Sequence, residues 1–369
     1  MKSAPTERTI GLRFHAQSPI GPRWISRVMV PVVRTLRAEH NASVAYLGRG
    51  WKHGPHIDLV ARGPQNIPWQ EIAGEIDWQA DGLPEPMTGE EYLAQARELG
   101  RLERVEPPYL PLHPRGTVTW IEDLPGRSGA PWPAALEGPR DLALTRMFGP
   151  LSRTLDLAAD RATGVPVTAV AEAFLALCTA HPRGLAHGVF SLRSHAEAFL
   201  HWASAAKDPR PSFRRRLAAD APVLRALVER VRDGGESAGA AEWRAAFAYS
   251  TGVFDATVDR GELSGDVLDA LTPAVDRERM GPPGLDGPVS AGRSEFHSAI
   301  AAAGLDQDTP GWFASYRLLI NLFYSRLPLL GVTPVQRYYL CFALAETVDE
   351  VYGESWRDRL DRTVGRRAA

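Results

Sequence analysis

The hydrophobic periodicity of this 369-residue sequence changes near residue 140. Up to about residue 125, runs of alternating apolar residues are interspersed with runs at helical spacing, which indicates strands and helices packed in layers. From about residue 140 onward, alanine and leucine recur every three or four positions almost throughout. The pattern predicts an α+β protein: an N-terminal mixed β-sheet with helices in a β-α-β-β order, followed by a mostly α-helical lobe.

The N-terminal part begins with the strand-like "TIGLRFHA" (9–16) and a helical stretch (23–40) that Pro31 should bend or interrupt. Two further strand-like runs, "SVAYLGRG" and "HIDLVARG", flank a Gly-Pro turn and predict a hairpin. Thr88, followed by early acidic residues, predicts a capped helix over 88–103. The other N-terminal elements that we expect are a helix at 68–79 and a strand at 117–122.

The change of pattern also suggests how the chain is organised. We expect residues 1–125 to form an α/β layer with a peptide-binding hairpin. Residues 140–369 should form a helical lobe that packs on the sheet, so that the whole chain is one integrated unit. The main helices predicted in this lobe lie at 140–162, 166–181, 194–206, 214–234, 240–261, 311–330 and 333–353.

The overall charge and the cysteines restrict the class of protein. The 42 basic and 44 acidic side chains nearly cancel, so no global charge marks a nucleic-acid or membrane-surface protein. Cys178 and Cys341 both lie in apolar helical sequence and are expected to be buried free thiols. The N-terminus has no apolar signal core, and no window approaches the roughly 18 consecutive apolar residues of a membrane span. We therefore expect a cytoplasmic protein.

The histidines give no strong sign of a metal site. The stretch "GWKHGPHIDLVARG" (50–63) places His53 and His56 on either side of a Gly-Pro turn, and no third ligand lies nearby at ligand spacing. Its glycines do not open a helix, as a phosphate-binding loop would require. His195 and His201 are six positions apart and should point to different sides of a helix, as surface or core residues. We expect neither a metal nor a nucleotide cofactor.

The late helical stretch "SYRLLINLFYSRL" (315–327) has an unusual polar face. Its apolar stripe includes Tyr316. The polar residues of the neighbouring face are Arg317, Asn321, Tyr324 and Ser325. Such a face belongs either to a core helix with one wet side or to the wall of a polar cleft, and the spacing fits both.

Four stretches, taken in order, resemble the C-terminal elimination domain of class I lanthipeptide dehydratases, a module also found alone in thiopeptide biosynthesis. The first is "VMVPVVRTLRAEHNASVAYLGRGWKHGPHIDLVARG", which ends where the family has a pattern like "gpHlRlR". The second is "VEPPYLPLHPRG", similar to "Y-x-P-E-x-x-R-Y-G-G", and "MFGPLSRTLDL" follows it. The last is "LINLFYSRLPLLGVTPVQRYYLCFALAETVDEVYG", similar to "H-x-x-x-N-R-L". The resemblance extends over the chain from end to end.

The departures from the family pattern fall on residues associated with glutamate elimination. Asp58 and Val60 stand where the family has two arginines. Leu112 replaces the glutamate of the second stretch, Asn321 replaces the histidine of the last, and Arg115 remains of the expected set. Elimination of glutamate needs a cation for the leaving carboxylate and a base for the α-proton. We therefore expect this chain to be disabled for that reaction.

The chain is in this respect similar to the thiopeptide pyridine synthases, a branch of the same family. The resemblance implies a formal [4+2] aza-cycloaddition of two dehydroalanines in an azole-containing precursor peptide. Loss of water and of the leader peptide as an amide would then give the pyridine of the macrocycle. The enzyme must fold a long peptide, favour the imidic-acid form of one amide and assist the eliminations. The implied partners are the precursor peptide and other enzymes of the pathway.

The resemblance also suggests which residues take part. The catalytic residues that we expect are Tyr109, His113, Glu122, Asn321, Tyr324 and Ser325. The two tyrosines would donate hydrogen bonds to the reacting groups, and His113 or Glu122 would transfer protons. The residues expected to contact the peptide are His56, Asp58, Arg115, Tyr316 and Arg317, with Arg214 and Arg215 as candidates for binding an acidic leader.

Two other functions remain open at this point. The chain could be a stand-alone glutamate-eliminating subunit with a rearranged site, or a scaffold that binds a leader peptide without catalysis. Each residue named above could also have an ordinary structural role, because none of them lies in a highly specific motif. Dehydroalanine formation from a glutamylated peptide would favour the first alternative, and leader binding without turnover the second.

Overall fold

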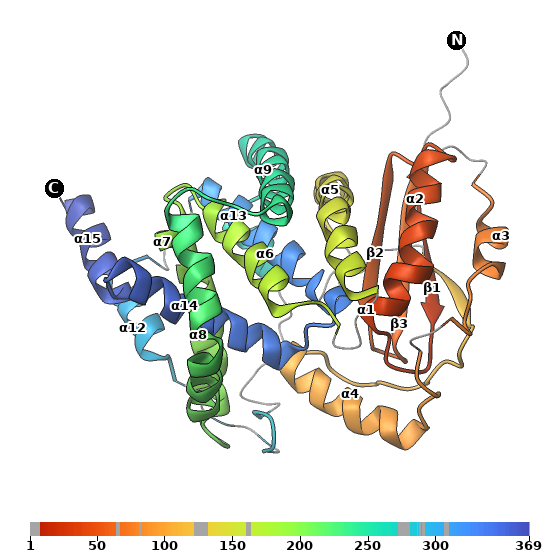
Figure 1. Cartoon of the computed structure of the whole chain (residues 1–369), viewed down its shortest axis with the longest axis horizontal. Coiled ribbons are helices and arrows are strands. Elements are labelled where there is room, and N and C mark those ends of the chain that lie inside the picture. Colours follow the sequence, from red (N-terminus) through yellow and green to blue (C-terminus); the bar gives the residue numbers. More distant parts are fainter. Residues whose placement is uncertain are drawn as a thin grey trace, which may run out of the picture.

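The computed structural model shows a small sheet at the N-terminal end of the molecule and helices over most of the remaining chain (Figure 1). The residues that the structure describes are 8–63, 67–80, 83–121, 132–159, 164–271, 281–285, 287, 289, 292–305 and 310–368. The α+β class predicted from the sequence is confirmed.

Four strands form the sheet: β1 (Arg8–His15), β2 (Val44–Gly50), β3 (His56–Gly63) and β4 (Val118–Ile121). Their order is β2-β3-β1-β4, and every neighbouring pair is antiparallel. The predicted mixed sheet is wrong, because β3 lies between β1 and β2 and separates the two strands that run in the same direction. With a helical crossover from β1 to β2, this is the strand order of a ferredoxin-like sheet.

The crossover from β1 to β2 is a helix with a break in its register. It consists of α1 (Pro22–Trp24), the π-helical turn η1 (Ile25–Met29) and α2 (Val30–Ala38). At the break, the N–H of Val30 bonds the carbonyl of Ile25 five residues earlier, and Pro31 has no N–H to offer. The predicted interruption at Pro31 is thus confirmed.

Two helices lie between β3 and β4. α3 (Trp69–Gly74) is shorter than predicted, whereas α4 (Gly89–Glu103) has the predicted length and cap. The Thr88 hydroxyl accepts a hydrogen bond from the N–H of Glu91 at 3.3 Å, and the Glu91 carboxylate accepts one from the N–H of Thr88 at 2.8 Å. This reciprocal capping box fixes where α4 begins.

The helical lobe follows the predicted order of helices. Its helices are α5 (Ala134–Ala159), α6 (Val167–Thr179), α7 (Leu185–Ala203), α8 (Arg210–Arg232), α9 (Ala238–Asp259), α10 (Gly265–Leu271), α12 (Glu295–Ala302), α13 (Gly311–Tyr324), the 3-10 turn η2 (Leu327–Leu330), α14 (Pro334–Tyr352) and α15 (Trp356–Ala368). The sequence did not predict α10, α12 or α15. α7 begins nine residues before the predicted start at 194, directly after Gly184, whose φ of 69° suits glycine.

The sheet and the helical lobe share one hydrophobic core, which runs from Leu12 and Phe14 of β1 to Leu344 of α14. α5 packs against β2 (Figure 1). The guanidinium of Arg326 donates to the carbonyl of Leu47, and that of Arg49 donates to the carbonyl of Pro328. Two buried or half-buried cations therefore connect β2 with the turn after α13. The predicted organisation into residues 1–125 and 140–369, with a peptide-binding hairpin, stays a prediction.

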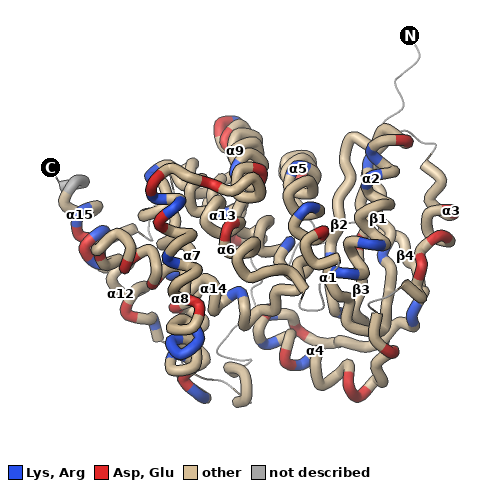
Figure 2. The backbone as a smooth tube through the Cα atoms, viewed as in Figure 1, with Lys and Arg blue, Asp and Glu red and all other residues tan. Residues whose placement is uncertain are grey.

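Charged residues of both signs are interspersed along the chain, and a basic group stands out at one end of α8 (Figure 2). Within the described chain, no helix is long and apolar enough to cross a membrane. Cys178 and Cys341 are both buried and free, as predicted.

Candidate active site

The beginning of α14 meets the end of α4 next to the helical lobe (Figure 1). The Tyr338 hydroxyl of α14 donates to the carbonyl of Leu102 in α4 at 3.3 Å. The first turn of α14 is held by a capping box between Thr333 and Gln336, with Pro334 at its first position. The cap fixes the position of Arg337, one residue further along.

Arg337 is a buried cation without a described acidic partner. Its residue is 3% exposed. Its Nε–H donates to Nε2 of His195 at 3.1 Å, and its guanidinium lies over the rings of Tyr324 and Tyr338, at 5.6 Å and 5.2 Å from their centres. Among the residues that the structure describes, no carboxylate forms an ion pair with it. Burying a charge without a counterion is costly, so such a cation points to a site for an anion or a polarised oxygen.

The electrostatic surroundings keep Arg337 charged. Desolvation lowers the pKa of Arg337, but Tyr338, Glu103 and Tyr324 raise it, and the net shift of its pKa is upward. Glu103 lies at the end of α4 and accepts a hydrogen bond from the indole of Trp51 at 3.4 Å. The carboxylate therefore acts on Arg337 from a distance and leaves its guanidinium without an ion pair.

His195 holds Arg337 from α7 and stacks between two phenol rings. Its ring centre lies 4.8 Å from that of Tyr324 and 4.8 Å from that of Tyr338. Because an arginine only donates, Nε2 of His195 must accept, and the neutral imidazole then has its proton on Nδ1. The sequence placed His195 on the surface or in the core, but the structure places it half-buried beside Arg337. Neither His195 nor Arg337 was among the predicted site residues, because neither belongs to a functional pattern within its own helix.

Tyr324, a predicted catalytic residue, lies at this same position. It is 3% exposed, and its hydroxyl is 3.4 Å from the Sγ of Cys341. Burial is the main cause that raises the pKa of Tyr324 well above its usual value, and the neighbouring Cys341 adds to it. The phenol therefore stays protonated and can donate a hydrogen bond. The polar face predicted for this helix thus brings one of its members to Arg337.

The other predicted residues of this face lie in different surroundings. Asn321 is exposed. The Ser325 hydroxyl donates to the carbonyl of Leu322 at 2.6 Å and accepts from Arg326, so it supports the connection to β2. Arg317 pairs with Asp269 at 2.8 Å. Tyr316 is 1% exposed, and its hydroxyl donates to main-chain carbonyls of α6 and α7 at 3.3–3.4 Å.

A second group of polar side chains, which we call the imidazole cluster, consists of His15, His53, His56 and His113. The ring of His15 lies 4.3 Å from that of His113 and 5.5 Å from that of His56. His53 lies 6.4 Å from His113, and the N–H of His113 bonds the carbonyl of His53 at 3.1 Å. The predicted residues His56 and His113 are thus brought together, with His15 of β1 between them. His15 was not predicted, because it ends a strand that is far from His56 and His113 in the sequence.

The surroundings of this cluster lower the pKa of three of its imidazoles, those of His15, His53 and His56. Burial, together with the neighbouring histidines and Arg13, lowers the pKa of His15 to about 3. Burial lowers the pKa of His56 to about 4, although Asp58 opposes the shift. Nδ1 of His56 lies 2.8 Å from the carbonyl of Gly54, to which a neutral imidazole donates. Nδ1 of His15 is buried and has no described partner.

Asp58, at a position of β3 where the family has an arginine, is paired with a neighbouring cation. Its carboxylate accepts two hydrogen bonds from Arg13, its cross-strand neighbour, at 2.7 Å and 3.0 Å. Desolvation alone would raise the pKa of Asp58, but the bonds from Arg13 and the charge of His56 lower it. β3 therefore lacks a cation at this position. The cross-strand cation, Arg13 of β1, is already paired with Asp58.

The segment before β4 holds Tyr109 and Arg115. The Tyr109 hydroxyl donates to the carbonyl of Val105 at 2.9 Å, and its ring lies 5.5 Å from that of Trp51. Arg115 donates to the carbonyl of Ala16 at 3.2 Å, to Ser18 at 3.0 Å and to the carbonyl of Pro84. Its guanidinium thus ties this segment to the end of β1. Glu122 lies outside the described residues, and the roles predicted for all these residues stay predictions.

Arg214 and Arg215 belong to the basic group at one end of α8 (Figure 2). Both are exposed, and neither has an ion-pair partner in the described part of the chain. They lie in the second turn of the helix, near the end whose dipole repels cations, so pairing with an external acid would be favourable.

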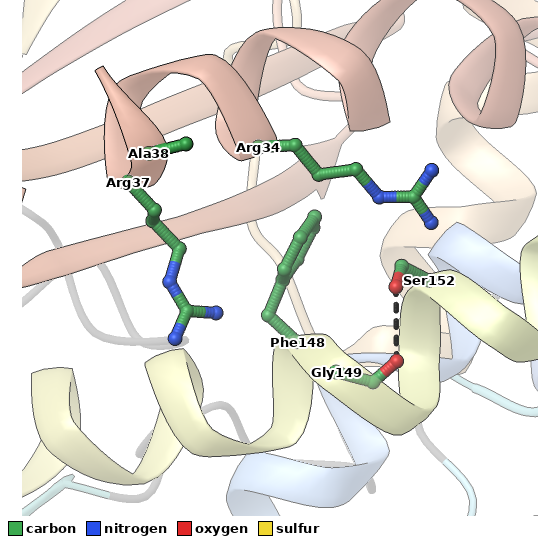
Figure 3. A pocket seen from close by; sticks show the side chains of 6 residues that line it. All are labelled: Arg34, Arg37, Ala38, Phe148, Gly149 and Ser152. Atoms are coloured by element: carbon green, nitrogen blue, oxygen red, sulfur yellow. Dashed lines mark hydrogen bonds between the residues drawn. The ribbon is translucent and has the colours of Figure 1, made fainter. Parts of the chain in front are cut away.

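Two of the surface hollows in the described part of the chain have a charged lining. One, of about 480 Å³, lies between α2 and α5, where Arg34 and Arg37 flank the ring of Phe148 (Figure 3). Asp156 already pairs with Arg34 at 2.9 Å. The other, of about 430 Å³, lies along α4. Although four imidazoles lie together, no three His, Cys, Asp or Glu side chains of the described chain are arranged to hold a metal ion, and the expected absence of a cofactor stays a prediction.

No protein-family model matches this sequence, and no curated protein matches it. Solved structures do match it in three dimensions. The pyridine synthase TbtD from thiomuracin biosynthesis aligns with a TM-score of 0.66 and 21% identity, over 94% of this chain and 99% of its own. This chain has the fold of a pyridine synthase.

A second solved structure of this fold, TsrL, aligns with a TM-score of 0.59 and 16% identity over 97% of this chain and 99% of its own. The tRNA-dependent lantibiotic dehydratase MibB from Microbispora sp. 107891 aligns at a TM-score of 0.41, with 15% identity over 96% of this chain and 29% of its own. The resemblance expected from the sequence is therefore confirmed for the pyridine synthase fold. At these identities the likeness concerns the fold, and the reaction has to be argued from the residues.

Proposed function

We propose that this protein is a peptide macrocyclase that joins two dehydroalanines of an azole-containing precursor peptide in a formal [4+2] cycloaddition. Loss of water and of the leader peptide as an amide would complete the pyridine. The observation that carries the proposal is Arg337, a buried guanidinium held by His195 and Tyr324 without a described counterion. The fold that the chain has in common with TbtD supports it.

The cycloaddition requires one amide of the peptide to react in its imidic-acid form, and negative charge develops on the amide oxygen as the N–H proton is removed and before the oxygen takes up a proton. A fixed cation in a site of low polarity stabilises such an oxygen far better than water does. Arg337 supplies this cation, and the protonated phenol of Tyr324 supplies a neutral donor beside it. The hydrogen bond from His195 orients the guanidinium, so little reorganisation is needed when the charge develops.

The two later steps need proton transfer. Each elimination removes one proton from the new ring and delivers one proton to the leaving group, water in one case and the leader amide in the other. A group that accepts and a group that donates are therefore sufficient. We infer that His113, half-buried in the imidazole cluster, is a candidate for this exchange, with Glu122 as the second candidate and Tyr109, Asn321 and Ser325 as further polar groups.

The peptide contacts that we propose come from the sheet side and the helical lobe. On the sheet side they include His56, Asp58 and Arg115, and in the lobe Arg317 and the exposed arginines of α8. Tyr316 would act through the packing of α13, since it is almost wholly buried. The pairing of Asp58 with Arg13 argues against the alternative of glutamate elimination, because the cation across the strand from that position is neutralised.

A direct test uses a synthetic thiazole peptide that carries two dehydroalanines and an N-terminal extension. We expect the protein to release the extension as an amide and to generate a pyridine chromophore, both visible by mass spectrometry and absorbance. Unchanged mass for several peptides of different ring size would contradict the proposal. A glutamylated serine peptide, run in parallel, should stay intact; its conversion to dehydroalanine would favour the eliminating subunit instead.

A further inference from the structure

The hollow along α4 has one cationic wall and one apolar wall. Leu93, Arg97 and Arg101 follow one another at four-residue spacing and so form a single stripe on α4. The facing wall is the segment from Pro107 to Leu110. Together they enclose about 430 Å³, which is within the range of a binding pocket. We call this hollow the α4 groove.

The apolar wall has an unusual capacity for side-chain contacts. Leu110 is 47% exposed, one of the most exposed large apolar residues described. Pro107 and Pro108 have no N–H, so half of this stretch cannot donate main-chain hydrogen bonds to a peptide. A partner would therefore be recognised by its apolar side chains, which fit against the proline rings and Leu110.

The cationic wall determines the charge of the partner. Arg97 is exposed and has no described partner, and Arg101 lies 3.8 Å from Glu98, the outer limit of an ion pair. A guanidinium binds a carboxylate in a bidentate manner and stacks on apolar surfaces. The groove thus fits a segment in which acidic and apolar residues alternate.

The α4 groove is linked to the candidate active site by side-chain contacts. Tyr109 forms part of its lining, and the Tyr109 ring contacts Trp51. The indole of Trp51 donates to Glu103 at the end of α4. The carbonyl of the preceding residue, Leu102, accepts a hydrogen bond from Tyr338, the neighbour of Arg337. A chain bound in the groove therefore lies along α4, whose last turn contacts Tyr338, the residue next to Arg337.

We propose that the α4 groove binds an acidic, apolar stretch of the precursor peptide outside its reacting core. This inference rests on the proposed function for the identity of the peptide, but the groove is defined independently of the chemistry. Bound in this way, the extension would raise the effective concentration of the core at Arg337. The attraction between Arg97 and carboxylates would weaken as salt rises.

The test uses two fluorescein-labelled peptides with the same bis-dehydroalanine core, one with an extension of alternating Glu and Leu and one with Gln in place of Glu. For the full-length protein we expect the acidic peptide to bind about tenfold more tightly at low salt, and Arg97→Glu to abolish this difference. Leu110→Ser should weaken both peptides. Arg37→Glu, the same reversal at an exposed arginine of the hollow in Figure 3, is the matched control and should change neither.

Each outcome decides the inference. An acidic preference that survives Arg97→Glu but is lost in Arg215→Glu would overturn it in favour of α8, and equal binding of the two peptides by the wild type would overturn it too. Anisotropy measures binding whether or not the core reacts. If the peptide binds through Arg97 but no pyridine forms, the proposed function fails while the groove assignment holds.

Discussion

Arg337 of α14 and His195 of α7 are joined by a hydrogen bond of 3.1 Å, and close by a second buried arginine joins the same two helices in the opposite direction. Arg193 of α7 donates to Glu346 and Asp349 of α14 at 2.8 Å each. One arginine is thus paired with two carboxylates and the other with an imidazole and phenol rings. The contrast separates a structural cation from one that is available for function.

Replacement of Arg337 by methionine should remove activity without unfolding the protein. We expect turnover to fall by about 100- to 1,000-fold, the usual cost of losing one donor to a developing negative charge. The free energy of unfolding should change by about 1 kcal/mol or less, because an unpaired buried charge is exchanged for an apolar chain of similar length. Steady-state kinetics and urea unfolding measure the two quantities.

Arg193→Met is the matched control for this prediction. It leaves Asp349 with one arginine fewer in half-buried surroundings, and should lower the free energy of unfolding by roughly 2–3 kcal/mol. A similar loss of stability in both variants would mean that Arg337 is a structural residue, and the proposed site would then lose its main support.

Removal of the Tyr324 hydroxyl should also affect catalysis more than stability. Tyr324→Phe removes a hydroxyl whose described partner is the Cys341 thiol, a weak one. The free energy of unfolding should therefore change by less than about 1 kcal/mol. Turnover should fall by about tenfold or more if the phenol donates to the reacting oxygen. Tyr316→Phe should show the opposite pattern, with stability lost and turnover retained, because its hydroxyl bonds two main-chain carbonyls. Equal turnover of Tyr324→Phe and wild type would exclude the donor role.

The imidazole cluster should make the protein sensitive to acid. His15 and His56 have folded-state pKa values of about 3 and about 4, below the unfolded value of 6.5, so the unfolded chain binds more protons between pH 6.5 and 4. Stability should therefore fall as the pH is lowered through this window, by roughly 2 kcal/mol for each imidazole at pH 5. Above pH 7 the two residues contribute no pH dependence.

His15→Phe tests this effect, because a ring of similar shape cannot take up a proton. Urea unfolding at pH 7 and pH 5 should show a smaller loss of stability in the variant than in the wild type, by roughly 2 kcal/mol. The same loss in both proteins would show that His15 is not a source of the acid sensitivity.

Gly100 should be intolerant of alanine although it lies in a helix. A Cβ at Gly100 would meet the Tyr109 phenol and lie 2.8 Å from the carbonyl of Val105. Gly100→Ala should therefore cost about 1–3 kcal/mol and distort the α4 groove. At Gly252, in α9, a Cβ meets nothing within 4 Å, and alanine should stabilise the protein by roughly 0.5–1 kcal/mol. Thermal unfolding of both variants checks the pair, and a stabilised Gly100→Ala would contradict the geometry around Tyr109.

Local chemistry made part of this fold predictable. The cap at Thr88, the interruption at Pro31 and the hairpin of β2 and β3 each depend on residues within a few positions of one another, and the structure confirms all of them. The strand order depends on contacts between distant segments. Alternation of apolar residues shows that a strand has two faces but does not identify its neighbours, so the antiparallel order escaped the prediction.

The candidate site shows the same division. Tyr324 could be proposed because it stands in a polar face with four-residue spacing, a pattern within one helix. His195 and Arg337 could not, because they stand in different helices and meet only through the packing of α7 on α14. His15 and Arg13 were missed for the same reason, since cross-strand pairing alone brings them to His56 and Asp58.

The two arginines that link β2 with the turn after α13 have a consequence for chimeric proteins. Arg49 and Arg326 both donate to main-chain carbonyls, of Pro328 and Leu47, so the acceptor exists whatever side chain stands at those positions. A sheet taken from one relative and a helical lobe from another would recreate this part of the joint wherever the two arginines and the backbone positions are kept. Recombination of such halves would therefore vary the proposed peptide-binding surfaces while the guanidinium connection between them is kept.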